Sequence, residues 1–213
     1  MLDNDQILYP LPTILKNRFK KWKYSLSKLN KQKFRTLYSK GQSPKTFLVT
    51  CCDSRINALD FFCSEPGEFF VQRNIASLIP EKNSKNKMCS SGAALEYAVL
   101  NLKVKNIIVV GHSNCGGVKA YCDNAIEKNN TLNISNWLDI LKPLNKIIKN
   151  TNNYELIEKE AVLLSVKNIL SYDFVKKAVK KKDVNIYALW FNIKNCEMQI
   201  YNHNKNKFIS LKV

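Results

Sequence analysis

The chain has 213 residues, of which 45% are hydrophobic, so it can bury a full core and is expected to form one domain. Its 34 lysines and arginines outnumber 17 aspartates and glutamates, for a formal net charge of +17. The lysines are spread along the chain, which favours a basic solvated surface over a nucleic-acid partner. An odd number of cysteines, no secretory signal and no run of ~18 apolar residues argue against a disulfide scaffold and a membrane span, and we expect a cytoplasmic protein.

Residues 12–40 carry apolar side chains at helical spacing on a strongly basic background. This pattern predicts an amphipathic helix or helix pair that ends at Gly41 and Pro44. We interpret residues 1–40 as the N-terminal helical arm of a single domain spanning residues 1–213. The apolar stripe of the arm needs cover from the domain or from another subunit. An acidic membrane surface is the alternative cover, but we expect no membrane contact.

Strand and helix patterns alternate through the rest of the chain. The predicted elements are strands at 46–51, 69–72 and 106–111, a helix at 90–102 capped by Ser90 or Ser91, helices at 134–148, 154–170 and 171–181, and strands at 184–193 and 198–201. This alternation predicts an α/β fold with a mainly parallel central sheet flanked by helices.

Cysteine, histidine and aspartate gather in two short segments, each directly after an apolar strand. They are Cys51 to Arg55 (CCDSR) and Gly111 to Gly117 (GHSNCGG). Open parallel sheets build their sites at such strand ends. Two thiolates and one imidazole suit Zn²⁺, and three protein ligands leave a fourth position for a reacting water. The sequence therefore predicts one catalytic zinc ion held by Cys51, His112 and Cys115.

Other residues of the two segments supply the remaining chemistry. If the first segment is extended, alternation places Asp53 and Arg55 on the side of the metal and turns Cys52 inward as a packing residue. Arg55 would then keep Asp53 ionised, as a hydrogen-bond acceptor and not as a metal ligand. Gly116 and Gly117 free the following backbone to present N–H groups at the start of a helix, where they can stabilise a developing anion. Zinc lowers the pKa of a bound water from ~15.7 to ~7, so we predict metal-assisted hydration.

The cysteines outside the predicted ligand set are interpreted as packing residues, and His203 as an exposed loop residue. Besides Cys52, this set comprises Cys63, Cys89, Cys122 and Cys196. A redox-sensing role for the Cys51–Cys52 pair is disfavoured, because adjacent cysteines form a poor disulfide and the chain contains no C-x-x-C motif.

The C-x-D-x-R and H-x-x-C motifs, with their strand contexts, resemble those of the β-class carbonic anhydrases, in the plant-like branch. The resemblance covers about residues 35–200. Further matching motifs are Gly41–Lys45 (GQSPK), Glu65–Glu68 (EPGE), Arg73–Ala76 (RNIA), Gly92–Val99 (GAALEYAV) and Glu158–Val162 (EKEAV).

This resemblance implies a zinc lyase that reversibly hydrates carbon dioxide to bicarbonate and a proton. The matched positions imply that Cys51, His112 and Cys115 bind zinc. They also imply that Asp53 and Arg55 form the catalytic dyad that orients a zinc-bound hydroxide.

The resemblance also implies substrate-binding roles for Gln42, Phe70, Tyr97 and Gly116. In the plant-like branch the Gln, Phe and Tyr side chains reach the zinc from a neighbouring subunit. The resemblance therefore implies a homodimer or a higher homo-oligomer, with the basic N-terminal arm packed on the partner.

Two other functions stay open at this point. The same fold and zinc site could hydrolyse carbonyl sulfide or carbon disulfide, with access to the pocket deciding between substrates. A basic zinc protein that binds nucleic acid would instead show an affinity for DNA or RNA that falls steeply with salt.

Overall fold

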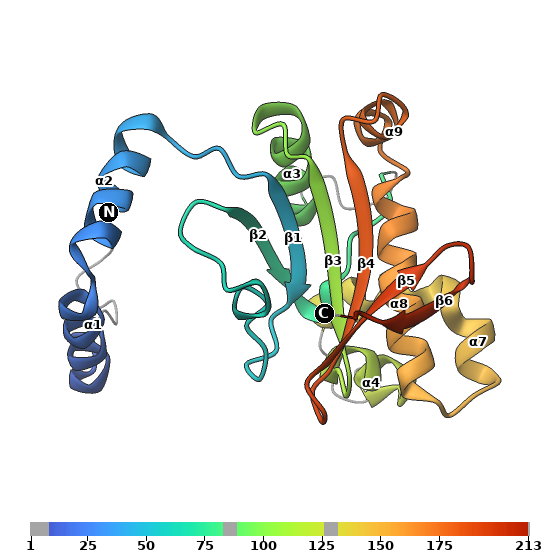
Figure 1. The fold of residues 1–213 in the computed structure, drawn as a ribbon. Coiled ribbons are helices and arrows are strands. Elements are labelled where there is room, and N and C mark those ends of the chain that lie inside the picture. Colours follow the sequence, from blue (N-terminus) through green and yellow to red (C-terminus); the bar gives the residue numbers. More distant parts are fainter. Residues whose placement is uncertain (1–8, 83–88, 126–131, 213) are drawn as a thin grey trace. The chain divides into compact units, whose positions relative to one another are not determined.

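The computed structural model describes residues 9–82, 89–125 and 132–212 (Figure 1). The chain divides after Gln42 into two compact units, which we describe separately. The first contains the predicted arm and consists of α1 (Thr13–Ser25) and α2 (Lys28–Lys40), so the helix pair is confirmed. The Ser27 side chain caps α2, and Gly41, with a φ of 75°, ends it in a conformation that favours glycine.

The apolar stripe of the arm is not buried by the arm itself. Neither α1 nor α2 contains a buried residue. The Trp22 ring contacts Phe19 and Phe34, at centroid distances of 5.7 and 6.2 Å, yet all three side chains stay exposed. Cover by a partner subunit stays a prediction.

The second unit is built on a six-stranded sheet in the order β2-β1-β3-β4-β5-β6. Its strands are β1 (Thr46–Cys51), β2 (Phe69–Asn74), β3 (Asn106–His112), β4 (Asn185–Asn192), β5 (Glu197–Asn202) and β6 (Lys207–Ser210). The first four strands in chain order pair in parallel, and β5 and β6 add an antiparallel edge. The predicted mainly parallel sheet is confirmed, whereas β6 was not predicted.

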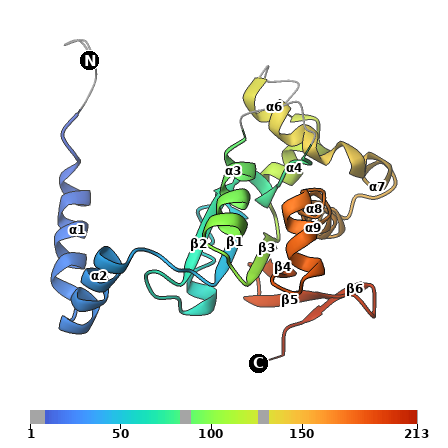
Figure 2. The same ribbon diagram turned by 90° about the horizontal axis from the view of Figure 1, so that it is seen from above.

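Helices cover one face of the parallel strands (Figure 2). The helical elements are α3 (Ser90–Glu96), α4 (Gly116–Cys122), α6 (Leu132–Leu138), α7 (Asn145–Lys149), α8 (Tyr154–Ile169) and α9 (Asp173–Lys180), with 3₁₀ turns η1 (Asp60–Phe62), η2 (Ile75–Ser77) and η4 (Asp139–Leu144) and a π-helical turn η3 (Tyr97–Asn101). In the described parts of the chain, no helix combines the length and apolarity needed to cross a membrane.

Two predicted helices differ in detail. The helix predicted at 90–102 changes to π-helical geometry at Tyr97, and its N-cap is the sulfur of Cys89, not Ser90 or Ser91. The helix predicted at 134–148 is broken into α6, η4 and α7. Pro143 lies at this break, and proline has no N–H for a helical hydrogen bond.

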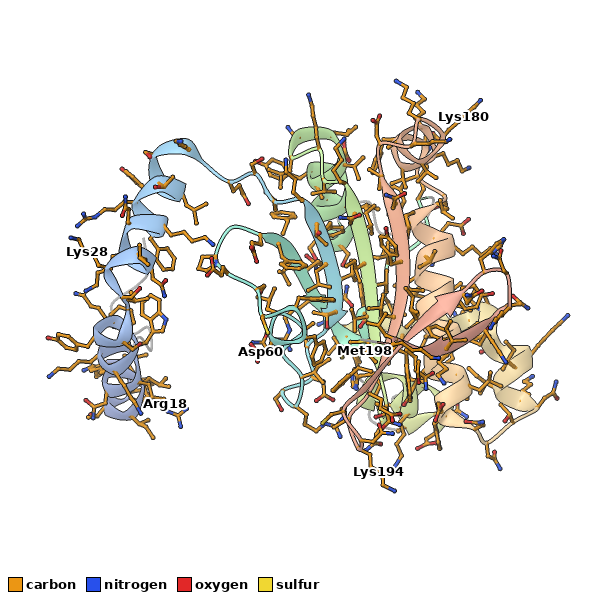
Figure 3. The ribbon with its side chains drawn as sticks, in the orientation of Figure 1. Arg18, Lys28, Asp60, Lys180, Lys194 and Met198 are labelled. Atoms are coloured by element: carbon orange, nitrogen blue, oxygen red, sulfur yellow. The ribbon has the colours of Figure 1, made fainter. Side chains whose placement is uncertain are left out.

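Basic side chains lie on both units of the protein. Figure 3 shows Arg18 and Lys28 on the N-terminal helices, and Lys180 and Lys194 at opposite ends of the second unit. The predicted absence of a nucleic-acid partner stays a prediction. His203 lies exposed in the turn between β5 and β6, as predicted.

Close packing of α8 on β3 requires a glycine at position 111. A Cβ atom there would lie 2.4 Å from Cγ2 of Val162, a buried β-branched residue that has little rotamer freedom. This contact brings α8 directly against the end of β3.

We predict that Gly111→Ala lowers the free energy of unfolding by about 1–3 kcal/mol, because the added methyl overpacks this contact. Urea unfolding measures the change. Gly116→Ala is the control, because a Cβ there meets no atom within 4 Å. Adding Val162→Ala should relieve the clash, so the double variant should lose less than the sum of the single losses. Additive losses would contradict this explanation.

Candidate metal centre and active site

The sheet topology brings three donor residues to one edge. β1 and β3 are parallel neighbours, with Thr50 opposite Val110, so their carboxyl ends meet. Cys51 is the last residue of β1, His112 is the last of β3, and Cys115 precedes the first residue of α4. One ligand atom from each of these buried residues lies within 4.8 Å of the others.

The imidazole of His112 is oriented for metal binding. Its Nδ1 lies 3.0 Å from the Ser113 carbonyl oxygen, which selects the tautomer with a proton on Nδ1. Ser113 is itself anchored to the end of β4: its N–H donates to Phe191 O at 2.9 Å, and its Oγ accepts the Ile193 N–H at 2.8 Å. His112 Nε2 is buried and has no hydrogen-bond partner in the described structure. Such an orphaned nitrogen beside two thiols fits a zinc ligand.

The protonation of the Cys51 thiol is coupled to that of the Cys115 thiol. The Cys115 thiol, and then the neighbouring His112 imidazole, stabilise the Cys51 thiolate and lower the pKa of Cys51 to about 4. The same contact with Cys51 raises the pKa of Cys115 above its usual range, because the pair shares one proton. A bound cation would replace that proton and stabilise both thiolates, so these residues fit Zn²⁺.

The segment after β1 is a turn and not an extended strand, so that expectation is wrong. β1 ends at Cys51, and Asp53 then closes a turn in which its Oδ1 accepts the Arg55 N–H at 2.9 Å and its carbonyl accepts the Ile56 N–H at 3.3 Å. Side-chain alternation therefore stops at Cys51. Cys52 was predicted to pack inward, but its side chain is exposed.

The turn nevertheless pairs Asp53 with Arg55. The guanidinium donates from Nε to Oδ1 at 2.9 Å and from Nη2 to Oδ2 at 2.6 Å. Nη2 also donates to Asn114 O at 2.8 Å, which ties the two sequence segments together. Hydrogen bonds from Arg55 hold the pKa of Asp53 well below its usual range. Asp53 Oδ2 lies 3.8 Å from His112 Nε2, beside the cluster of donor atoms.

Arg73 holds the backbone of this turn, a role that the sequence did not assign to it. Its Nε donates to Cys51 O at 3.0 Å, and its Nη2 donates to Asp53 O at 3.0 Å and Ile56 O at 3.1 Å. Arginine is one of the rarest residues in this lysine-rich chain, and a planar donor fork suits several carbonyl groups at once.

Glu158, on α8, is a second residue whose role was missed. Its Oε1 accepts the Cys115 backbone N–H at 2.9 Å, and its Oε2 accepts the Trp190 indole N–H at 3.3 Å. Burial raises the pKa of this carboxyl, and the N–H donors oppose the shift. The sequence did carry a signal, because Glu158 stands at helical spacing with the buried residues Ala161 and Val162.

The predicted substrate-binding residues lie in different places. Gly116 begins α4 next to Cys115, and the space at its Cα is open. The rings of Phe70 and Tyr97 contact each other at a centroid distance of 5.8 Å. Phe70 stands four residues before Asn74, the partner of Cys51 in the sheet, which places it about 13 Å along the strand from the cluster.

The structure thus does not bring Phe70 and Tyr97 to the zinc ligands of their own subunit. Gln42 belongs to the first unit, and its contact with substrate stays a prediction. All four substrate-binding roles are taken up below as proposals.

The remaining cysteines are less buried than expected. All seven cysteines are free. Cys63 and Cys196 are exposed, as is Cys52, so the packing interpretation is wrong for these three. Cys63 and Cys196 have φ values of 44° and 57°, which are turn conformations at the surface. Cys89 and Cys122 are half-buried.

Comparison with known proteins gives a consistent result. The carbonic anhydrase family model matches residues 46–198. The chain is 40% identical over 171 residues to beta carbonic anhydrase 3 of Arabidopsis thaliana, covering 74% of this chain and 65% of that protein. It is 33% identical over 186 residues to a carbonic anhydrase of Helicobacter pylori (strain J99), covering 81% and 83%. The β-carbonic anhydrase CcaA has a similar structure, with a TM-score of 0.85, 27% identity and coverage of 94% and 92%.

The chain belongs to the β-class carbonic anhydrases. The resemblance inferred from the two motifs is therefore confirmed. β-Class carbonic anhydrases are zinc enzymes, and the Cys51, His112 and Cys115 cluster has the donor set that this metal requires.

We predict that Cys51→Ser reduces the zinc content of the purified protein to a small fraction of one ion per chain, because a serine hydroxyl is a poor replacement for a thiolate ligand. Cys52→Ser is the matched control. This neighbouring exposed cysteine should be dispensable, and its variant should keep about one zinc per chain. Metal analysis by inductively coupled plasma mass spectrometry measures both, and equal zinc contents would contradict the ligand assignment.

Proposed function

We propose that this chain catalyses the reversible hydration of carbon dioxide to bicarbonate and a proton, at one zinc ion held by Cys51, His112 and Cys115. The observation that carries the proposal is the convergence of these three buried donors beside the Asp53–Arg55 pair in a β-class family member. When bound, zinc supplies a Lewis acid that lowers the pKa of a coordinated water from ~15.7 to ~7, so that a nucleophile exists near neutral pH.

Asp53 orients the attacking oxygen in this proposal. Arg55 contacts both carboxylate oxygens, so Asp53 is ionised and held in one orientation. Asp53 Oδ2 lies near His112 Nε2, at 3.8 Å, and can accept a hydrogen bond from an attacking oxygen at the metal position. That hydrogen bond directs a lone pair of the oxygen toward the carbon of the substrate.

A homo-oligomer completes the substrate pocket in this proposal. Gly116 borders open space beside Cys115, while Gln42, Phe70 and Tyr97 are contributed by a neighbouring subunit. Two observations support the arrangement: Phe70 lies far along its strand from its own cluster, and the arm buries none of its apolar residues. The seven free cysteines fit the reducing cytoplasm in which we place the enzyme.

We predict that Asp53→Asn slows carbon dioxide hydration by about 10²-fold or more, because an amide cannot replace an ionised acceptor held by Arg55. The variant should retain zinc. Stopped-flow measurement with a pH indicator gives the rate, and Asp60→Asn, at an exposed aspartate of η1, is the charge-matched control. Full activity in Asp53→Asn would contradict the proposed mechanism.

The choice between the two candidate activities has a separate test on the unaltered protein. If it turns over carbon disulfide faster than carbon dioxide, that result favours the hydrolase alternative.

We predict that two inactive variants restore activity when they are co-expressed. Cys115→Ser removes a zinc ligand, and Tyr97→Ala removes a residue proposed to serve the partner's site. In a mixed dimer, the intact zinc site of one subunit receives Tyr97 from the other. Random pairing should restore about a quarter of the wild-type activity, because about half of the dimers are mixed and each has one intact site. Absence of recovery in confirmed mixed dimers would show that Tyr97 acts within its own subunit.

A further inference from the structure

Glu158 is a buried carboxylate that contacts the predicted zinc ligands without belonging to them. It is 4% exposed and lies on the buried face of α8. Each of its oxygens accepts one N–H group, from the Cys115 backbone at 2.9 Å and from the Trp190 indole at 3.3 Å. The carboxylate thus joins three elements, α8, β4 and the start of α4.

The hydrogen bond to Cys115 acts on the residue that carries a ligand atom. The Cys115 N–H direction depends on the peptide plane before its Cα, and that plane helps to fix where the side chain points. Trp190 is completely buried and stands opposite Gly111 in the sheet, so it is a rigid support for the carboxylate. Close packing of α8 against Gly111 adds a second fixed point behind the site.

We propose that Glu158 is a positioning residue for the zinc ligand Cys115, and that it acts through its two accepted hydrogen bonds and not through its charge. The proposal rests on the zinc site described above. Two N–H donors converge on this side chain, so it must offer two acceptors. A carboxylate offers both, whereas an amide of the same shape offers one acceptor and one donor.

The test is a set of variants in which zinc affinity is measured by competition with a chelator. Glu158→Gln should bind zinc about 10–100-fold more weakly, because its amide must leave one N–H unpaired or turn away from Cys115. The sulfur-to-metal absorption band of the cobalt-substituted protein should change as well. Glu160→Gln, two positions along the same helix, removes the same charge and should leave zinc affinity unchanged.

Trp190→Phe provides the rescue. It removes the second donor, so in the double variant the amide introduced by Glu158→Gln can direct its oxygen to Cys115 alone. Zinc affinity should then return close to that of Trp190→Phe by itself, even though thermal unfolding shows a less stable protein. If zinc affinity instead falls in step with thermal stability across Glu158→Gln, Trp190→Phe and the double variant, the proposal is overturned, because Glu158 would then only support the fold.

Two further outcomes would also overturn the proposal. In the first, Glu158→Gln binds zinc as tightly as the unaltered protein. In the second, the double variant folds but its zinc affinity does not recover, which would mean that the negative charge of Glu158 is what supports zinc binding. If the double variant does not fold, the comparison of Glu158→Gln with Glu160→Gln decides, and equal affinities or an unchanged cobalt band reject the proposal. A chain that binds zinc in the predicted manner but does not hydrate carbon dioxide would contradict the proposed function and leave this inference standing.

Discussion

The parallel pairing of β1 with β3 is the constraint on which the rest of this structure depends. It places the carboxyl ends of two strands side by side and so brings Cys51 near His112 and Cys115, which are about 60 residues away in the chain. The three donors are buried, and His112 Nε2 has no hydrogen-bond partner in the described structure. Burying polar atoms without partners is costly. Here a cation that accepts lone pairs from all three donors would offset the cost. The stability of this end of the sheet is therefore linked to metal binding.

Three residues outside the predicted ligand set each hold a different ligand in place. Arg73 fixes the backbone that carries Cys51 and Asp53, Ser113 fixes the imidazole of His112, and Glu158 accepts the N–H of Cys115. Each of these residues is anchored in turn to a strand or a long helix. The donors are therefore positioned by rigid elements, although each of the three adjoins a turn.

The parts that one chain does not bring together are equally informative. Phe70, in the amino-terminal half of β2, contacts Tyr97 of η3, and Phe70 is distant along its strand from the zinc ligands of its own subunit. The arm carries exposed aromatic residues. Both features fit a molecule whose active unit contains more than one copy of the chain, as we propose. The same active sites would then depend on assembly as well as on folding.

The sequence by itself predicted every strand except β6, the parallel sheet, the helix pair of the arm and the three residues that cluster as candidate zinc ligands, because apolar periodicity and the spacing of cysteine, histidine and glycine residues are local signals. It also pointed to the family, through motifs that later comparison confirmed. It could not determine the conformation after Cys51, where β1 ends and a turn, not strand alternation, pairs Asp53 with Arg55 and leaves Cys52 exposed. Nor could it show that Glu158 reaches Cys115, since that contact depends on how α8 packs against β3. Contacts between residues remote in the chain depend on packing, so only the tertiary structure decided them.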